Sequence, residues 1–176
     1  MVYREGERYR HPGKPEWGVG QVLSAAENRV LLFFVGGGRR TIVVDRVRLE
    51  PVAAGEGQWR CLDALEGLDW QRARRNLYVV RLDPRVLRIE RFRTENPTYN
   101  PELPCVYVGI TGLSPEERFQ NHLRGHKASW FVKEFGRKLM PERYRRFNPM
   151  PDELARYVEP DYSKWLRLLG YAVWSN

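Results

Sequence analysis

Arg118 and His122 lie four residues apart in a segment that is predicted to be helical, so both side chains are expected on one helical face. Tyr107 lies in the short apolar run 106–110 that precedes this helix. A tyrosine from the strand and an arginine from the helix can meet where the two elements pack. These groups suit redox or acyl-transfer chemistry poorly, whereas a phenol and a guanidinium fit the binding and hydrolysis of a phosphodiester.

Local signals predict where this strand and this helix begin and end. The β-branched run 106–110 is bounded by a proline and a glycine, as is typical of a strand. Ser114 is a favourable N-cap, Pro115 suits the first helical position, and Glu117 completes a capping box. The segment therefore predicts a strand, a tight turn and a capped helix in direct succession.

The order of these motifs resembles the GIY-YIG nuclease superfamily. A Tyr-Val-Gly run begins at Tyr107, an upstream strand carries Tyr78, and Arg118 follows on the next helix. The resemblance covers about residues 76–176. It implies that Tyr78 and Tyr107 are the two tyrosines of the family and that Arg118 is its arginine. It also implies a short antiparallel sheet flanked by helices.

The family binds a divalent metal ion through a glutamate further along the chain. Glu159 is the predicted ligand of one Mg²⁺ or Mn²⁺ ion, and Glu153 is the reserve. Glu159 is expected just before an amphipathic helix that ends at Gly170. Pro160 is expected to kink that helix or to begin a new one. The alternative for Glu159 is a favourable charge near a helix N-terminus.

The resemblance implies a role for each catalytic candidate. Tyr78 would be the general base, which requires a phenol pKa lowered from about 10. Arg118 would hold the non-bridging phosphate oxygens, and Tyr107 would position the water or the phosphate. His122 is an alternative base or a phosphate contact. Each of these residues also has a structural alternative, since tyrosines pack in strands and arginines and histidines are common on surfaces.

The charge balance favours a polyanionic partner. The 176 residues include 30 Lys and Arg against 22 Asp and Glu, a formal net charge of +8 at pH 7. Such an excess is typical of nucleic-acid-binding proteins. A charged run is also typical of a solvated face, so both interpretations remain open, with His126 expected at the rim of the site. The predicted nucleic-acid contacts are Arg124, Lys127, Lys133, Arg137 and Lys138.

Residues 1–52 are predicted to form a small all-β SH3-like barrel, because short strand patterns follow one another without helical periodicity. The expected strands are 6–10, 21–24, 29–35, 41–44 and 47–52. The motif order resembles Tudor-like domains of bacterial repair helicases and of RNA-polymerase-interacting proteins. Tyr9 and Trp17 are expected to pack in the core or, alternatively, to form an exposed aromatic platform. Arg39 and Arg40 are expected at a solvent-exposed hairpin tip, where phosphate contact is the alternative.

Residues 53–75 are predicted to be a linker that starts flexibly and contains a short helix within 62–70. Trp59 or Trp70 is expected to dock it. The second domain is predicted to span 76–176, so that the whole chain is α+β. Its further expected elements are a strand at 86–92 and helices at 128–135 and 154–169.

The two cysteines, Cys61 and Cys105, show neither a disulfide framework nor metal-ligand spacing. No signal peptide and no long apolar run is apparent, so a cytoplasmic protein without a membrane partner is expected.

The leading functional hypothesis is a metal-dependent endonuclease that cleaves DNA, with branched or damaged DNA among its substrates. The barrel would target it to nucleic acid or to a protein such as RNA polymerase. The alternative is a non-catalytic adaptor on a degenerate nuclease fold that binds DNA or RNA polymerase. RNA as a substrate also stays open, as do repair, defence and mobile-element roles.

Overall fold

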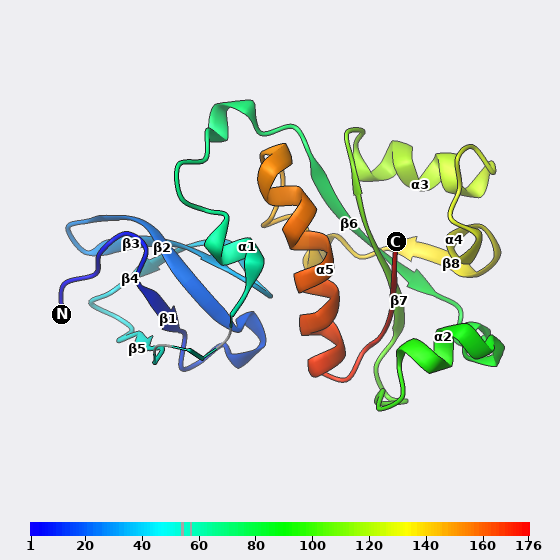
Figure 1. The fold of residues 1–176 in the computed structure, drawn as a ribbon, viewed down its shortest axis with the longest axis horizontal. Helices are drawn as coiled ribbons and strands as arrows, with labels where there is room; N and C mark the ends of the chain where they lie inside the picture. Colours follow the sequence, from blue (N-terminus) through cyan, green and yellow to red (C-terminus); the bar gives the residue numbers. More distant parts are fainter. Residues whose placement is uncertain (54, 57) are drawn as a thin grey trace.

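The computed structural model describes residues 1–176 apart from Ala54 and Gly57. In this part of the chain the fold is α+β, with two β-sheets and five α-helices. Figure 1 shows the N-terminal sheet at one end, the second sheet toward the other end, and α5 (Asp152–Leu168) between them. Every helix in the described residues is too short or too polar to be a membrane-spanning segment.

The N-terminal region, residues 1–52, forms an antiparallel sheet of five strands in the order β4-β3-β2-β1-β5. The strands are β1 (Arg8–Arg10), β2 (Val19–Ala26), β3 (Arg29–Phe34), β4 (Gly38–Val43) and β5 (Glu50–Pro51). The prediction of a small all-β region is therefore confirmed. Tyr9 is buried and Trp17, in a short 3₁₀ turn, is half-buried, so packing explains both residues better than an exposed platform.

The predicted hairpin tip at Arg39 and Arg40 is wrong, because both residues lie inside β4. Gly38 begins that strand with a φ of 64°, a conformation that glycine adopts without strain. A Cβ atom on Gly38 would lie 2.6 Å from the backbone of Arg146. Glycine therefore lets β4 approach the C-terminal half closely, and the Arg39 amide donates to the carbonyl oxygen of Arg146 at 2.9 Å.

The connecting segment 53–75 contains α1 (Arg60–Asp63) and a 3₁₀ turn at Trp70–Arg72. Its predicted flexible start includes Ala54 and Gly57, which lie outside the described residues. Both candidate docking residues contact the rest of the molecule. Trp59 is buried with its ring centroid 5.9 Å from that of Trp165, and Trp70 lies under the guanidinium of Arg39 at 4.6 Å.

The second sheet has four strands in the order β8-β6-β7-β9. They are β6 (Asn76–Leu82), β7 (Cys105–Thr111), β8 (Gly136–Leu139) and β9 (Ala172–Ser175). The pairs β6–β7 and β6–β8 are antiparallel, as expected, whereas β9 pairs with β7 in parallel. The predicted antiparallel sheet is thus correct for three strands and gains a parallel edge.

The predicted strand at 86–92 is wrong, because this segment forms a 3₁₀ helix at Pro84–Arg88 and then α2 (Glu90–Glu95). Asp83 caps the first of these through its side chain, and a proline follows at the first helical position. Despite this long excursion, β6 and β7 pair along their whole length.

Helices cover the second sheet on both faces (Figure 1). As predicted, α3 (Pro115–Leu123) begins with a capping box, and α4 (Trp130–Phe135) is shorter than expected. Of the two alternatives predicted for Pro160, the start of a new helix is wrong, since α5 is one helix with Pro160 inside it. Buried Val158 and Tyr162 on either side hold α5 against the core and outweigh the lost backbone hydrogen bond.

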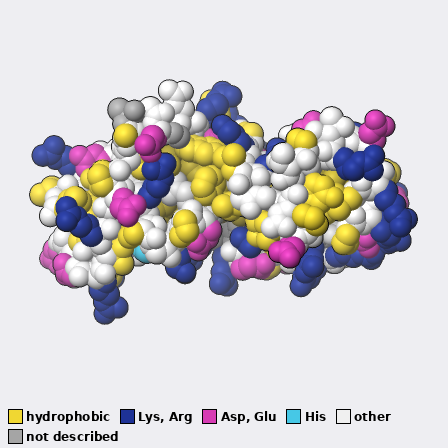
Figure 2. All heavy atoms as spheres, turned by 90° about the horizontal axis from the view of Figure 1, so that it is seen from below, with side chains coloured by type: hydrophobic (Ala, Val, Ile, Leu, Met, Phe, Trp, Pro, Cys, Tyr) yellow, Lys and Arg dark blue, Asp and Glu magenta, His cyan; other side chains and the backbone are white. Residues whose placement is uncertain are grey.

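One hydrophobic core joins the two halves of the molecule. Val19, Phe33 and Val35 of the N-terminal region belong to the same buried cluster as the strands and helices of the second half, and a smaller cluster fills the rest of that region. Figure 2 shows Lys and Arg side chains along the whole length of one face. Surface charge alone therefore does not locate a functional site.

Candidate active site

Tyr78 and Tyr107 lie on the same face of the second sheet. In the antiparallel register Tyr78 pairs with Gly109 and Tyr107 pairs with Val80, which places the two tyrosines on adjacent strands with the same side-chain direction. Their ring centroids are 5.9 Å apart, and each side chain is 1% exposed. The predicted pairing of these tyrosines is therefore present, across the long segment that separates them in sequence.

The glycine of the Tyr-Val-Gly run makes room for the first tyrosine. A Cβ atom on Gly109 would lie 2.6 Å from both Cζ and Oη of Tyr78, and 2.9 Å from a ring carbon of Tyr107. Any side chain here would displace the Tyr78 hydroxyl. The spacing Tyr-x-Gly therefore has a packing reason, since the second strand must leave a gap for the phenol of the first.

His122 of α3 hydrogen bonds to this phenol. Its Nε2 lies 2.8 Å from Oη of Tyr78, and its Nδ1 accepts from the backbone amide of Ser129 at 2.9 Å. A neutral imidazole that accepts at Nδ1 carries its proton on Nε2, so His122 donates to Tyr78. Burial, together with the charge of Arg118, lowers the pKa of His122 to about 4, so the ring is neutral near pH 7.

The alternative interpretation of His122 as a surface histidine is wrong, because the side chain is 0% exposed. Both ring nitrogens are engaged, so its Nδ1 lone pair is not free to accept a proton from water. The geometry favours His122 as a group that orients Tyr78 over a role as the base itself.

Arg118 lies one helical turn before His122 and is partly exposed. Its Nη2 donates to the carbonyl oxygen of Lys127 at 3.0 Å, which restrains the guanidinium. Burial raises the pKa of the Tyr78 phenol, whereas the hydroxyl of Tyr107 and the charge of Arg118 lower it. Arg118 is thus close enough to act electrostatically on Tyr78.

Glu159 approaches the same groups from α5. Burial raises the pKa of its carboxyl to about 7, against backbone hydrogen bonds from Asn176 and Ile110. When ionised, it also raises the pKa of both tyrosines, which places its charge near them. Glu159 lies in the middle of α5 and not before a helix, so the helix N-terminus explanation of this residue is wrong.

Glu153, the reserve ligand, does not join the site. It lies in the first turn of α5 and is exposed. Six residues of helix separate it from Glu159, a rise of about 9 Å. Of the two predicted metal ligands, the structure brings only Glu159 to the tyrosines.

The side chains of the site can be compared with those that bind a divalent cation in proteins. The described residues contain no group of three or more His, Cys, Asp or Glu side chains that could enclose a metal ion. A single carboxylate instead fits Mg²⁺ or Mn²⁺, because Mg²⁺ retains several waters and binds through one or two carboxylates plus substrate phosphates. Glu159 fits that mode, and it must be ionised to bind.

The predicted nucleic-acid contacts divide into two groups. Arg124, Lys127 and Lys133 are exposed near the end of α3, where Lys133 Nζ would lie 3.5 Å from a Cβ atom on Gly125. Arg137 is held by the carboxylate of Asp83. Lys138 pairs with Arg81, which points to the sheet face opposite that of Tyr78. Only the first group borders the candidate site.

Sequence reasoning missed three residues that position the site. The side chain of Asn176 donates to Oη of Tyr107 at 2.9 Å, and Ser129 fixes the tautomer of His122. The side chain of Asn148 donates to the carbonyl oxygen of Leu77 and accepts from its amide, both at 2.7 Å, which secures β6 beside Tyr78. Each contact joins distant segments, so no local pattern could have predicted it.

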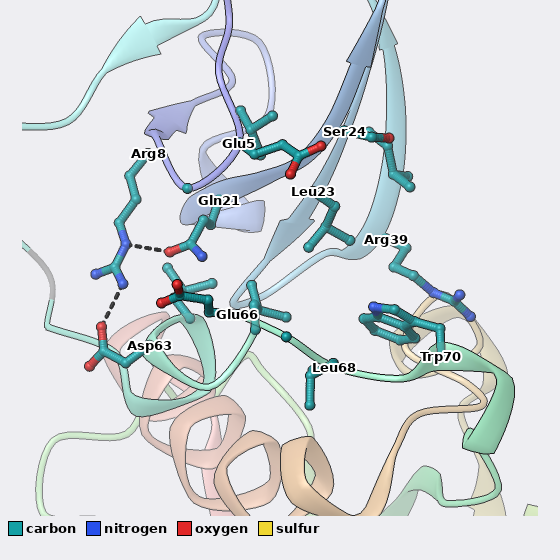
Figure 3. Close-up of a pocket in the computed structure, with 16 residues that line it drawn as sticks. Glu5, Arg8, Gln21, Leu23, Ser24, Arg39, Asp63, Glu66, Leu68 and Trp70 are labelled. Atoms are coloured by element: carbon teal, nitrogen blue, oxygen red, sulfur yellow. Dashed lines mark hydrogen bonds and ion pairs between the residues drawn. The ribbon is translucent and has the colours of Figure 1, made fainter.

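A separate cavity of about 910 Å³ lies between the N-terminal sheet and the connecting segment. Figure 3 shows Arg8 between Gln21 and Asp63 on one side of this cavity and Arg39 against Trp70 on the other. None of the residues that line it belongs to the candidate active site.

Comparison with known proteins identifies a family only for the N-terminal region. Residues 4–52 match the family described as protein of unknown function, DUF3553. The DUF3553 match includes β1 to β5 and ends before Tyr78. No curated protein and no solved structure matches the chain. Because the DUF3553 description names no activity, the function has to be argued from the geometry of the site.

Proposed function

We propose that this protein is a metal-dependent endonuclease of the GIY-YIG type that hydrolyses DNA phosphodiester bonds. The observation that carries the proposal is the convergence of side chains from four elements. Tyr78 comes from β6, Tyr107 from β7, Arg118 and His122 from α3, and Glu159 from α5. A phenol, a guanidinium and a carboxylate close to one another provide a base, an anion clamp and a cation ligand.

In this mechanism Tyr78 first loses its phenol proton to solvent and then, as the phenolate, accepts the proton of the attacking water. Burial raises the pKa of Tyr78 in the free protein, so a phenolate requires added positive charge nearby. The Nε2–H of His122 points at Oη of Tyr78 and stabilises a negative charge there. A divalent ion on Glu159 would supply further positive charge for the phosphate and for the departing 3′ oxygen.

The other two residues act on the phosphate. Arg118 presents a planar fork of N–H donors to the non-bridging oxygens, which carry the charge that develops in the transition state. Burial raises the pKa of Tyr107 well above its usual range. Tyr107 therefore stays a neutral phenol and positions water or phosphate through its hydroxyl.

The N-terminal region is proposed to be an SH3/Tudor-like module that recruits nucleic acid or a protein such as RNA polymerase. Cys61 and Cys105 are free and buried, which agrees with a cytoplasmic setting.

The test is cleavage of supercoiled plasmid in Mg²⁺ or Mn²⁺, comparing wild type with Arg118→Ala and Glu159→Gln. Matched controls are Arg46→Ala, an exposed arginine of the N-terminal region, and Glu153→Gln at the start of α5. Metal-dependent nicking that is lost in the first pair and retained in the second supports the proposal. Binding of DNA without nicking by wild type in either metal would instead favour the non-catalytic adaptor.

A further inference from the structure

A basic cleft lies between the N-terminal sheet and the C-terminal half, away from Tyr78. It encloses about 500 Å³ and is lined by Arg39 and Arg40 of β4 and by Arg145 and Arg146 of the segment before α5. These four residues define what we call the interdomain arginine cleft. The remaining lining residues are Trp17, Leu31, Thr41 and Asn148. No carboxylate is among them.

The two inner arginines are held in fixed positions. Arg39 donates through Nη2 to the carbonyl oxygens of Asn148 and Pro149, each at 3.3 Å. Arg40 donates through Nε to the carbonyl oxygen of Gly37 at 3.0 Å and lies over the ring of Trp17 at 4.5 Å. A guanidinium carries five N–H donors, so each arginine keeps further donors for a ligand.

The positive charges in this cleft repel one another. Burial lowers the pKa of Arg40, and the charges of Arg146 and Arg145 lower it further. None of the four arginines forms a salt bridge with the described residues. Glu16 is the nearby acid that acts on Arg40, but it lies outside the cleft lining, with Lys14 Nζ at 4.0 Å. An anion with several oxygens would relieve this repulsion.

The aromatic ring at the cleft, that of Trp17, already packs against three side chains. Trp17 is covered by Arg40, by His11 with ring centroids 5.1 Å apart, and by Phe34 with ring centroids 5.3 Å apart. Recognition here therefore has to use charge and hydrogen bonding to phosphate oxygens, without base stacking.

We propose that the interdomain arginine cleft binds successive phosphates of a nucleic-acid backbone, independently of base sequence. This inference rests on the proposed function for the identity of the polyanion. The cleft is also linked to the catalytic strand, because Arg39 holds the backbone of Asn148, whose side chain holds Leu77 next to Tyr78. A nucleic-acid strand bound in the cleft would therefore be held in a fixed position relative to β6.

The test measures DNA affinity without added metal, by fluorescence anisotropy of a labelled duplex over a series of salt concentrations. The variant is Arg145→Ala with Arg146→Ala. The backbone of Arg146 accepts from the Arg39 amide, whereas these two side chains make no hydrogen bond or ion pair with the described residues, so docking is preserved. The matched control is Arg46→Ala with Arg48→Ala, an exposed pair with the same charge that does not line the cleft.

The expected result is a fall of about 2 in the slope of log affinity against log salt, since each phosphate contact contributes about 0.9 on duplex DNA. The control pair should change the slope much less, and duplexes of different sequence should behave alike. Equal losses for the two pairs would overturn the inference. So would the absence of DNA binding by wild type, or binding of poly-glutamate that depends on Arg145 and Arg146 while DNA binding does not.

Plasmid nicking separates this inference from the proposed function. If the double variant loses affinity while wild type cleaves no DNA, the cleft stands and the nuclease proposal fails. If wild type nicks plasmid and the double variant binds DNA as tightly as the control pair, the nuclease proposal stands and the cleft fails.

Discussion

The tyrosine site and the interdomain arginine cleft differ in the ionisation state of their side chains. Around Tyr78, burial keeps the titratable groups neutral, since it raises the pKa of both tyrosines and lowers that of His122 to about 4. In the cleft, the guanidinium groups keep their charge at any working pH and repel one another. Under the two proposals, the first region serves proton transfer and the second holds an anion.

The largest effect is expected from Tyr78→Phe, which removes the proposed base. Cleavage should fall by about 10²–10⁴-fold, the usual contribution of general base catalysis, while DNA affinity stays unchanged. Single-turnover cleavage and anisotropy measure the two quantities. Tyr144→Phe is the control, because that buried hydroxyl has no hydrogen-bond partner among the described residues. Parallel losses of affinity and cleavage in Tyr78→Phe would break the division between the two regions.

A second test displaces the same hydroxyl without removing it. In Gly109→Ala the new Cβ would lie 2.6 Å from Oη of Tyr78. Overpacking of this kind destabilises by about 1–3 kcal/mol, and a misplacement near 1 Å can slow a reaction about 100-fold. Urea denaturation and cleavage rates would show both changes. In the control Gly112→Ala, the nearest atom is the flexible end of Arg75 at 3.2 Å, so both effects should be small.

Stability should depend on pH through Glu159. Its pKa is raised from 4.5 to about 7, so the group stabilises the fold below pH 4.5, and this stabilisation is lost as the pH rises through about 7. Glu159→Gln should therefore raise the free energy of unfolding by about 1–3 kcal/mol at pH 8 and by little near pH 4.5. Urea titrations at the two pH values measure it.

The control for this prediction is Glu153→Gln, which should leave stability nearly unchanged at both pH values because the side chain is exposed. A Glu159→Gln variant that is less stable at pH 8 would mean that the carboxylate is held by a favourable charge. The tyrosine site would then hold a charged group near pH 8, as the arginine cleft does, and the contrast between the two regions would be weaker than proposed.

The smallest effect is expected from single substitutions of Lys133 and Arg137, measured by the salt dependence of DNA binding. Lys133→Ala should reduce the salt slope of DNA binding by about 0.9 if this lysine contacts a phosphate. Arg137→Ala should change it far less, because the guanidinium is already held by Asp83. Anisotropy at several salt concentrations is the measurement. Identical slopes for the two variants would mean that the ion pair with Asp83 does not reduce the contribution of Arg137 to DNA binding.

Local signals made much of the scaffold of the candidate active site predictable. The strand that contains Tyr107 and the capped helix that carries Arg118 depend on neighbouring residues, and the structure has both where the sequence predicts them. The pairing of Tyr78 with Gly109 was predictable only through the family resemblance, because a long excursion separates the strands. The five N-terminal strands were predictable because short strand patterns follow one another without helical periodicity, although β4 begins earlier than expected.

Tertiary contacts account for the failures. Pro160 is a helix-breaking signal by itself, but buried neighbours keep α5 continuous and put Glu159 at its centre. The segment 86–92 alternates like a strand, yet Asp83 and Pro84 start a helical turn before it. Arg39 and Arg40 follow three glycines, and only the close approach of β4 to the C-terminal half shows that they are enclosed.

The core shared by Val19, Phe33 and Val35 with the second half bears on how such a chain can be inherited. A module that is shuffled between genes has to leave its parent with a polar surface. This N-terminal sheet, if separated, would instead expose an apolar face that packs against Phe147 and Trp165 of the second half. Recombination within the chain would expose both faces to water, so changes on one face are expected to be matched by changes on the other.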